Sequence, residues 1–188
     1  MSGLIVTGII VIVALWAVGL YNSLVNLRQR NRQAFADIDV QLKQRHDLVP
    51  NLVETVKEYA RHERETMDAV VNARNEAVGA RGAAQQAAAE NALSAALGKM
   101  FALAEAYPDL KANQNFLQLQ QQLDDIENKL AAARRFFNSA VAEYNAKRES
   151  FPASLLANSF GFNAQDFFDL GEEKRTELES PPPVSFQQ

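Results

Sequence analysis

The chain has 188 residues, enough for one domain of ordinary size, and its formal net charge is −4 at pH 7. A nucleic-acid-binding surface needs concentrated basic side chains, so this acidic balance argues against nucleic acid as a partner. The chain contains no cysteine, which excludes disulfides, thiolate metal sites and a cysteine nucleophile.

The first segment is apolar, and no charged side chain occurs before Arg28. As a helix, residues 4–24 would span roughly 30 Å, the thickness of the hydrocarbon core of a bilayer. Trp16 and Tyr21 lie in its second half, and aromatic rings suit the lipid–water interface. A secretory signal peptide needs a basic start and a small-residue cleavage site, and this segment has neither. We therefore expect residues 1–26 to be an uncleaved transmembrane anchor.

The basic residues nearest to the anchor all follow it. Arg28, Arg30 and Arg32 come directly after the apolar segment, and no Lys or Arg precedes it. Because positive charge favours the cytoplasmic side, we expect a single-pass protein of the inner (cytoplasmic) membrane, with its N-terminus outside and the rest in the cytoplasm. The three arginines also suit anionic lipid headgroups. We predict that they form a membrane-interface region together with Trp16 and Tyr21.

The segment KQRHDLVPNLVETVKEYARHE, residues 43–63, keeps one apolar face in phase on both sides of Pro50. A proline inside a helix removes one hydrogen bond and clashes with the carbonyl four residues back, which here belongs to His46. Either the helix kinks near Asp47 and continues, or Asp47 caps a new helix that has Pro50 in its first turn. Both alternatives keep the apolar face aligned, with Arg45 in the slot between Leu42 and Val49.

We favour the first alternative, a kinked and nearly continuous helix from the membrane to about Ala77. Gly79 and Gly82 then supply a turn. A second helix is predicted over residues 83–107, and its Ala-rich start has high helix propensity but little core volume.

A heptad stripe marks the next long helix, residues 113–150, with Asn113 as its N-cap and Pro152 as its stop. An apolar stripe with alternating steps of three and four residues is typical of a coiled coil or a helical bundle. Phe136 and Val141 widen this stripe and favour a bundle. The stripe comprises Phe116, Leu119, Leu123, Ile126, Leu130, Ala133, Phe137, Ala140 and Tyr144.

The predicted fold is all-α. The turns between the helices are short, so neighbours should be antiparallel, and residues 27–160 should form an elongated bundle of three long helices plus a short fourth that ends at Gly161. Residues 161–188 are rich in Phe and Pro and predict an extended C-terminal tail. Either its rings dock back on the bundle or the segment binds a neighbour or partner. The candidate interaction residues are Phe160, Phe162, Phe167, Phe168 and Phe186.

The search for catalytic chemistry finds no pattern that supports an enzyme. His46 and His62 would lie roughly 24 Å apart along one helix, too far to share a metal ion. The segment HERET lacks the second histidine of a zinc motif, and no phosphate-binding loop or nucleophile motif occurs. We expect both histidines to be solvated surface residues. We also expect no enzymatic activity and no cofactor.

Two blocks, DVQLKQRHDLVPNLV and RRFFNSAVAEYN, carry a resemblance to the LemA family. The resemblance implies a bacterial single-pass membrane protein with an N-out helix and a long helical-bundle domain. It implies no catalytic residues. Phe35 stands where the family pattern leads us to expect Trp, and Phe137 where Tyr is common. Both positions keep an aromatic ring, but any hydrogen bond from that ring is lost.

These observations favour a membrane-anchored scaffold or adaptor at the cytoplasmic face of the membrane. Its expected partners are membrane lipid, copies of itself, and envelope or cytoplasmic proteins, because a wide apolar seam can serve several neighbours. A membrane-organising or remodelling oligomer is the alternative. A ligand- or metal-binding helical bundle is a third and weaker one.

Overall fold

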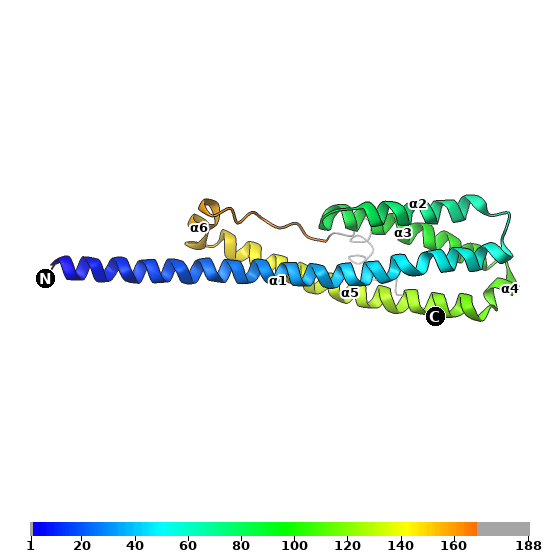
Figure 1. Cartoon of the computed structure of the whole chain (residues 1–188), viewed down its shortest axis with the longest axis horizontal. Helices are drawn as coiled ribbons and strands as arrows, with labels where there is room; N and C mark the ends of the chain where they lie inside the picture. The colour runs from blue at the N-terminus through cyan, green and yellow to red at the C-terminus, as the bar shows by residue number, and fades with distance from the viewer. Residues whose placement is uncertain (1, 169–188) are drawn as a thin grey trace, which may run out of the picture. The chain divides into compact units, whose positions relative to one another are not determined.

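The computed structural model describes residues 2–168, so the predicted interaction residue Phe186 lies outside the described residues. The described part of the chain is helical and contains no strand, which confirms the all-α prediction (Figure 1). Its helices are α1 (Ser2–Tyr59), α2 (Arg64–Gly79), α3 (Ala83–Ala104), α4 (Pro108–Lys111), α5 (Gln114–Glu149) and α6 (Ala153–Ser159).

The described residues divide into two compact units. The N-terminal unit contains residues 2–42 and 125–167, and the four-helix unit contains residues 43–124 with Phe168. The two longest helices, α1 and α5, each contribute one part to each unit.

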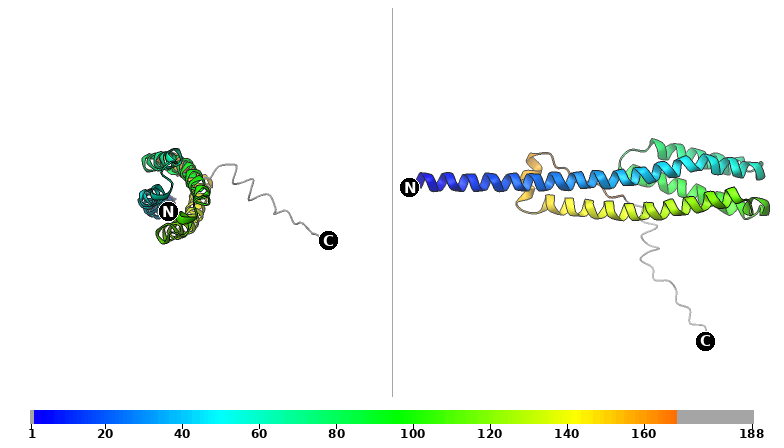
Figure 2. Two further views of the ribbon diagram at one scale, coloured as in Figure 1. Left: turned by 90° about the vertical axis from the view of Figure 1, so that its right-hand side faces the viewer. Right: turned by 60° about the horizontal axis from the view of Figure 1, so that its bottom comes forward.

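The four-helix unit is built from the end of α1, then α2 and α3, and the start of α5. Successive helices run in opposite directions beside one another (Figures 1 and 2). Their apolar faces meet in one core, to which the short helix α4 adds Leu110. The buried residues of this core are Val49, Leu52, Val56, Ala60, Val70, Ala77, Leu93, Leu97, Met100, Ala104, Leu110, Phe116 and Leu123.

The first long helix ends earlier than the sequence suggested. We predicted a helix to about Ala77, but α1 ends at Tyr59 and residues 60–63 turn the chain into α2. This turn contains neither Gly nor Pro, so no local signal marks it. A continued helix would carry Val70 and Ala77 away from the core, whereas the turn lets both side chains become buried in it.

The other boundaries follow the predicted signals. Gly82 precedes α3 with φ of 78°, a left-handed conformation that glycine adopts without strain. Pro108 begins α4, where its missing N–H costs nothing. Asn113 precedes α5, and its Oδ1 accepts a hydrogen bond of 3.0 Å from the amide of Phe116, which confirms the predicted N-cap.

The heptad stripe of α5 is also confirmed. Seven of the nine predicted positions are buried, and Leu119 and Ala133 are partly buried. Val141, which widens the stripe, is completely buried, whereas Phe136 is 46% exposed.

One core cluster of the N-terminal unit joins α1, α5 and α6. It consists of Leu24, Tyr144, Ala153, Ala157 and Phe162. Helix α6 ends at Ser159, two residues before the predicted end at Gly161, and Gly161 has a φ of 67° in the turn that follows. The amide of Phe162 bonds to the carbonyl of Ala157 at 3.0 Å, the arrangement that closes a helix through a left-handed glycine. This turn directs the chain so that Phe162 is buried while Phe160, two residues earlier, stays exposed.

Candidate functional site

The N-terminal part of α1 has the composition and exposure of a membrane-spanning helix. Its most apolar window has a mean hydropathy of 2.6, and none of that window is buried within the protein. Trp16 is 52% exposed and Tyr21 is 37% exposed. Leu24, the next core-facing position, is completely buried. The helix therefore passes within one turn from a surface open on all sides into a packed protein core.

An aromatic cluster surrounds Tyr21 at this transition. The ring of Tyr21 lies 5.3 Å from that of Phe160 and 5.5 Å from that of Phe162, both in edge-to-face geometry. The guanidinium of Arg28 lies 4.9 Å from the centre of the Phe162 ring. These contacts attach the segment after α6 to the end of the apolar segment of α1.

Side chains of α5 hold this same segment by hydrogen bonds to its backbone. The hydroxyl of Tyr144 donates to the carbonyl of Asn163 at 2.9 Å, and Arg148 Nε donates to the carbonyl of Phe162 at 2.7 Å. Asn145 bonds to both the amide and the carbonyl of Gln165, at 3.0 Å and 2.9 Å. Burial raises the pKa of the Tyr144 hydroxyl, and the nearby Arg28 and Arg148 partly oppose this rise.

The four candidate interaction phenylalanines that the structure describes therefore differ in their surroundings. Phe162 and Phe168 are each 2% exposed, so these two rings are buried in the protein. Phe160 and Phe167 are 59% and 47% exposed and remain candidates for an external contact. Docking onto the protein thus applies to Phe162 and Phe168. Contact with a neighbour or partner stays possible for Phe160 and Phe167 of the same segment.

The three arginines after the apolar segment also differ from one another. Arg28 packs on Phe162, as described above. Arg30 forms an ion pair of 2.9 Å with Glu143, and its guanidinium lies 5.7 Å from the centre of the Phe136 ring. Arg32 is exposed. Two of the three side chains thus have protein contacts in addition to their predicted role at the membrane interface.

The two positions at which the chain departs from the family pattern lie against each other. The rings of Phe35 on α1 and Phe137 on α5 are 5.4 Å apart. Phe137 is buried, and Phe35 is partly buried. Packing between the helices is therefore kept at this point by two rings that carry no polar atom.

A buried polar cluster in the four-helix unit joins α1 and α3. The carboxylate of Glu90 is completely buried and accepts a hydrogen bond of 2.8 Å from Arg45 and lies 2.6 Å from His46 Nε2. Arg45 also donates to the hydroxyl of Ser94 at 2.7 Å. Each charge that leaves water in this cluster has an opposite charge or a hydrogen-bond partner.

The buried cluster corrects our expectation that His46 is a solvated surface residue, because His46 is only 7% exposed. His62, in contrast, is exposed. The useful signal in the sequence was a charge within each of two apolar stripes. Arg45 interrupts the stripe of α1, and Glu90 falls between Ala87 and Leu93 on the buried face of α3.

The region around Pro50 shows how α1 accommodates its proline. The helix is continuous from Ser2 to Tyr59, so Asp47 does not cap a new helix. Pro50 has no N–H to donate to the carbonyl of His46. Arg74 of α2 fills this gap, because its Nε donates to the carbonyl of His46 at 3.3 Å. A neighbouring helix thus replaces the hydrogen bond that the proline removes.

Asp47 pairs within its own helix. Its carboxylate accepts a hydrogen bond of 2.6 Å from Lys43, one turn earlier. This hydrogen bond, together with the positive charges of Lys43, Arg74 and His46, lowers the pKa of Asp47. Both side chains of the pair are largely exposed, so the pair contributes little to stability.

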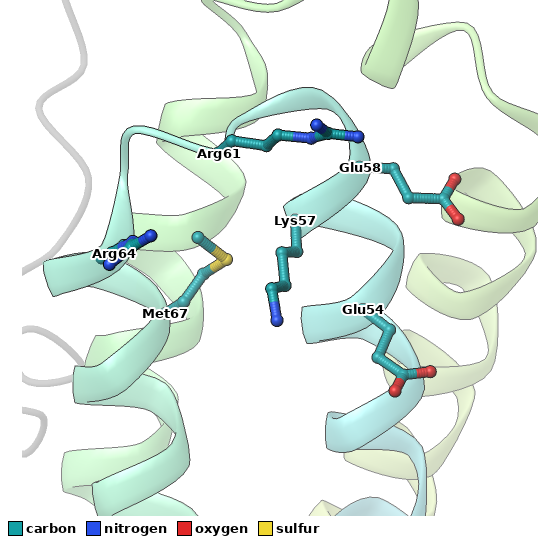
Figure 3. A pocket seen from close by; sticks show the side chains of 6 residues that line it. All are labelled: Glu54, Lys57, Glu58, Arg61, Arg64 and Met67. Carbon is teal, nitrogen blue, oxygen red and sulfur yellow. The ribbon is translucent and has the colours of Figure 1, made fainter.

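An open pocket of about 510 Å³ lies where α1 turns into α2 (Figure 3). Figure 3 shows Lys57 and Met67 between the two helices, whereas Glu54 and Glu58 point away from this space. The lining carries both signs of charge and therefore favours no class of ligand. Within residues 2–168, no three His, Asp or Glu side chains lie close enough together to hold a metal ion. The lining residues are Glu54, Lys57, Glu58, Arg61, Arg64 and Met67.

Comparison with known proteins gives one family and three relatives. The model of the LemA family matches residues 34–186, which is most of the chain. Magnetosome protein MamQ of Magnetospirillum gryphiswaldense is 30% identical over 80 residues, which cover 43% of this chain and 29% of that protein. Magnetosome proteins MamQ 1 and MamQ 2 of Paramagnetospirillum magneticum are 28% identical over the same lengths. The chain therefore matches less than a third of the length of these relatives.

Proposed function

The chain belongs to the LemA family, and from this premise we propose that it is a membrane-anchored helical scaffold that associates with copies of itself. The N-terminus lies outside the cell and the two units lie at the cytoplasmic face of the inner membrane. The protein acts by binding and positioning other molecules, membrane lipid and protein partners among them, and catalyses no reaction.

One observation carries this function. The same helix, α1, is exposed and apolar at its start and supplies core residues to both units further on. A soluble protein would expose this apolar surface to water at a large free-energy cost, whereas a bilayer would cover it. Membership of the LemA family and the apolar start of α1 together indicate a membrane-associated protein.

Membrane anchoring is tested with two matched pairs of arginines on α1. Val11→Arg with Leu15→Arg places two charges in the middle of the apolar segment, where each costs about 3 kcal/mol. Val40→Arg with Gln44→Arg adds the same charges at the same spacing on exposed positions further along. After alkaline extraction of native membranes, the first variant should be lost from the membrane fraction and the second retained. Retention of the first variant would contradict the anchor.

The orientation is tested by labelling, because the chain has no cysteine of its own. Single variants Ser2→Cys and Asn51→Cys are treated with a membrane-impermeant maleimide on intact cells. Residue 2 should react, and residue 51 should react only after the membrane is opened. The reverse pattern would show that the positive charges after the span do not set its direction.

Self-association has a candidate contact on α2. Val71 and Val78 are both exposed and lie seven residues apart, so they share one face of the helix, whereas Val70 and Ala77 face the core. In native mass measurements with mild detergent and in cross-linking, the intact chain should give an oligomer. Val78→Glu should weaken that oligomer, and the control Asn72→Glu, also exposed on α2, should not. A monomer of the intact chain would count against the scaffold.

A membrane-organising oligomer is the second candidate function, and the exposed aromatic segment around Phe160 favours it. Arg32 is the suitable residue for its test because it is exposed, whereas Arg28 and Arg30 take part in packing and ion pairing. If the protein organises anionic lipid, Arg32→Gln should reduce any change of vesicle shape seen by electron microscopy. If the Arg32→Gln variant changed vesicle shape as much as the unaltered protein, Arg32 would not be a lipid contact.

A further inference from the structure

The connection from α5 into α6 and beyond exposes three large apolar side chains that the core does not use. Phe151 is 81% exposed, Leu155 is 63% exposed and Phe160 is 59% exposed. They belong to the N-terminal unit, in the short stretch that contains α6. Isolated apolar residues are common on protein surfaces, but three within ten residues of sequence, called the patch below, need a reason.

The same stretch carries no charge. Residues 150–165 contain no Asp, Glu, Lys or Arg, although Arg148 and Glu149 directly precede them and Asp166 follows. A loop in water usually contains charged or strongly polar side chains, and an uncharged loop with exposed phenyl rings suits a less polar environment.

The patch is joined to the apolar segment of α1. Phe160 contacts Tyr21 at a centroid distance of 5.3 Å, and Phe162 anchors the segment from the inside. In Figure 1, α6 lies beside α1, beyond the apolar stretch at the N-terminus. Phe160, one of the three exposed side chains, therefore adjoins the apolar segment of α1 at Tyr21.

The length of the exposed part of α1 indicates how deep in the membrane the patch lies. Helix α1 is exposed over nearly every residue from Ser2 to Gly19, and Leu24 is its first buried residue. Residues 4–19 span roughly 24 Å, which is less than the roughly 30 Å of a hydrocarbon core. The turn of α1 that contains Tyr21 must then reach the edge of the hydrocarbon region, and the segment that packs on Tyr21 lies at the same depth.

We propose that Phe151, Leu155 and Phe160 form a second membrane contact, in which the segment around α6 inserts its apolar side chains into the lipid interface beside the transmembrane helix. This inference rests on the membrane anchoring proposed above. The contact would fix the N-terminal unit against the membrane surface at two points, the span and the α6 segment, and so limit its rotation about α1.

The test uses tryptophan fluorescence of the full-length protein in vesicles of phosphatidylcholine and phosphatidylglycerol that contain brominated acyl chains. Bromine quenches only a tryptophan that reaches the acyl region. In a Trp16→Phe background, Phe151→Trp, Leu155→Trp and Phe160→Trp each place one tryptophan in the patch. Phe136→Trp is the matched control, because Phe136 is 46% exposed in the same unit but lies about 20 Å from the end of α5.

The expected result is a blue-shifted emission at positions 151, 155 and 160 and a loss of intensity in brominated lipid several-fold greater than at position 136. The native Trp16 in the unaltered chain reports separately on the span. Quenching of Trp16 with no more quenching at positions 151, 155 and 160 than at position 136 would overturn the second contact and leave the anchor standing. No quenching of Trp16 would overturn both.

The same measurement separates lipid from a protein neighbour. If a second copy of the chain covers the patch, tryptophan at position 151 or 160 will be blue-shifted but insensitive to brominated lipid. That outcome would overturn the membrane contact. Circular dichroism of each variant should match that of the unaltered chain, because the three side chains contribute little to the core.

Discussion

In the four-helix unit, the buried Glu90 bonds to both Arg45 and His46, whereas in the N-terminal unit Asn31 is only 3% exposed and neither of its amide atoms has a hydrogen-bond partner within the described residues. The buried polar groups of the four-helix unit therefore depend on one another, whereas the buried amide of Asn31 in the N-terminal unit depends on no such group.

This difference indicates which unit is more sensitive to a single polar substitution. Removing one member of a satisfied buried cluster takes a hydrogen-bond partner from the groups that stay buried, whereas removing an unpaired amide takes away a cost. A substitution of a buried polar side chain by a less polar one should therefore lower the free energy of unfolding at Glu90 and raise it at Asn31.

The largest effect is expected at Glu90. Glu90→Gln keeps the size of the side chain but leaves Arg45 and His46 without their carboxylate, so the free energy of unfolding should fall by about 3–5 kcal/mol. The exposed Glu76→Gln on α2 is the control and should change it by less than about 0.5 kcal/mol. Thermal denaturation followed by circular dichroism measures both. Equal effects of the two variants would mean that the buried cluster is not a structural unit.

A double-mutant cycle on Arg74 and Pro50 tests the cross-helix hydrogen bond. Arg74→Met leaves the carbonyl of His46 without a donor and should cost about 1–2 kcal/mol of unfolding free energy. In a Pro50→Ala background the restored backbone N–H supplies that donor, so the same Arg74 change should cost much less. Urea denaturation of the four proteins gives the coupling energy. Additive effects would show that Arg74 does not replace the missing bond.

The N-terminal unit should respond in the opposite direction. Asn31→Leu replaces an unpaired buried amide with an apolar side chain of similar size and should raise the free energy of unfolding by about 1 kcal/mol. Exposed Asn26→Leu, also on α1, is the control for a general gain in apolarity. A thermal melt of the protein in detergent measures both variants. A loss of stability at position 31 would show that Asn31 has a structural role in this unit.

The smallest effect concerns the exposed pair of Lys43 and Asp47. Because the pKa of Asp47 is lowered from its usual value of 3.8, the pair stabilises the folded state above that pH and loses its contribution as the pH falls through the lowered pKa. Lys43→Ala should raise the pKa of Asp47, as measured by NMR titration of its carboxyl carbon. The stabilities of the two proteins should converge in acid. An unchanged pKa would mean that the pair is not formed in solution.

The sequence predicted the helices best where regular periodicity and turn residues agree. The stripe of α5, the cap at Asn113 and the glycine turns at Gly82 and Gly161 all belong to this class. The turn after Tyr59 could not be predicted, because residues 60–63 contain no helix-breaking residue and the turn gains its stability from distant core contacts. Pairing between helices is a property of the folded chain and leaves little local trace.

The candidate site was predicted only in part for the same reason. Composition identified the apolar segment and its flanking arginines, but not that Arg28 packs on a ring from the α6 segment more than a hundred residues later. Glu90 was missed because a single Glu in an Ala-rich helix resembles a surface residue. Only its position in the apolar stripe, read together with that of Arg45, indicates a buried pair.

The burial of Leu24 has a practical consequence for obtaining this protein without lipid. The apolar part of α1 enters the core with no intervening linker. No truncation can therefore remove its exposed apolar surface and leave the N-terminal unit intact. A fragment that begins after Leu24 loses a core side chain and the Tyr21 ring that covers Phe162. Truncation for solubility would therefore open the unit it was meant to isolate, and detergent or lipid discs are the better route to an intact sample.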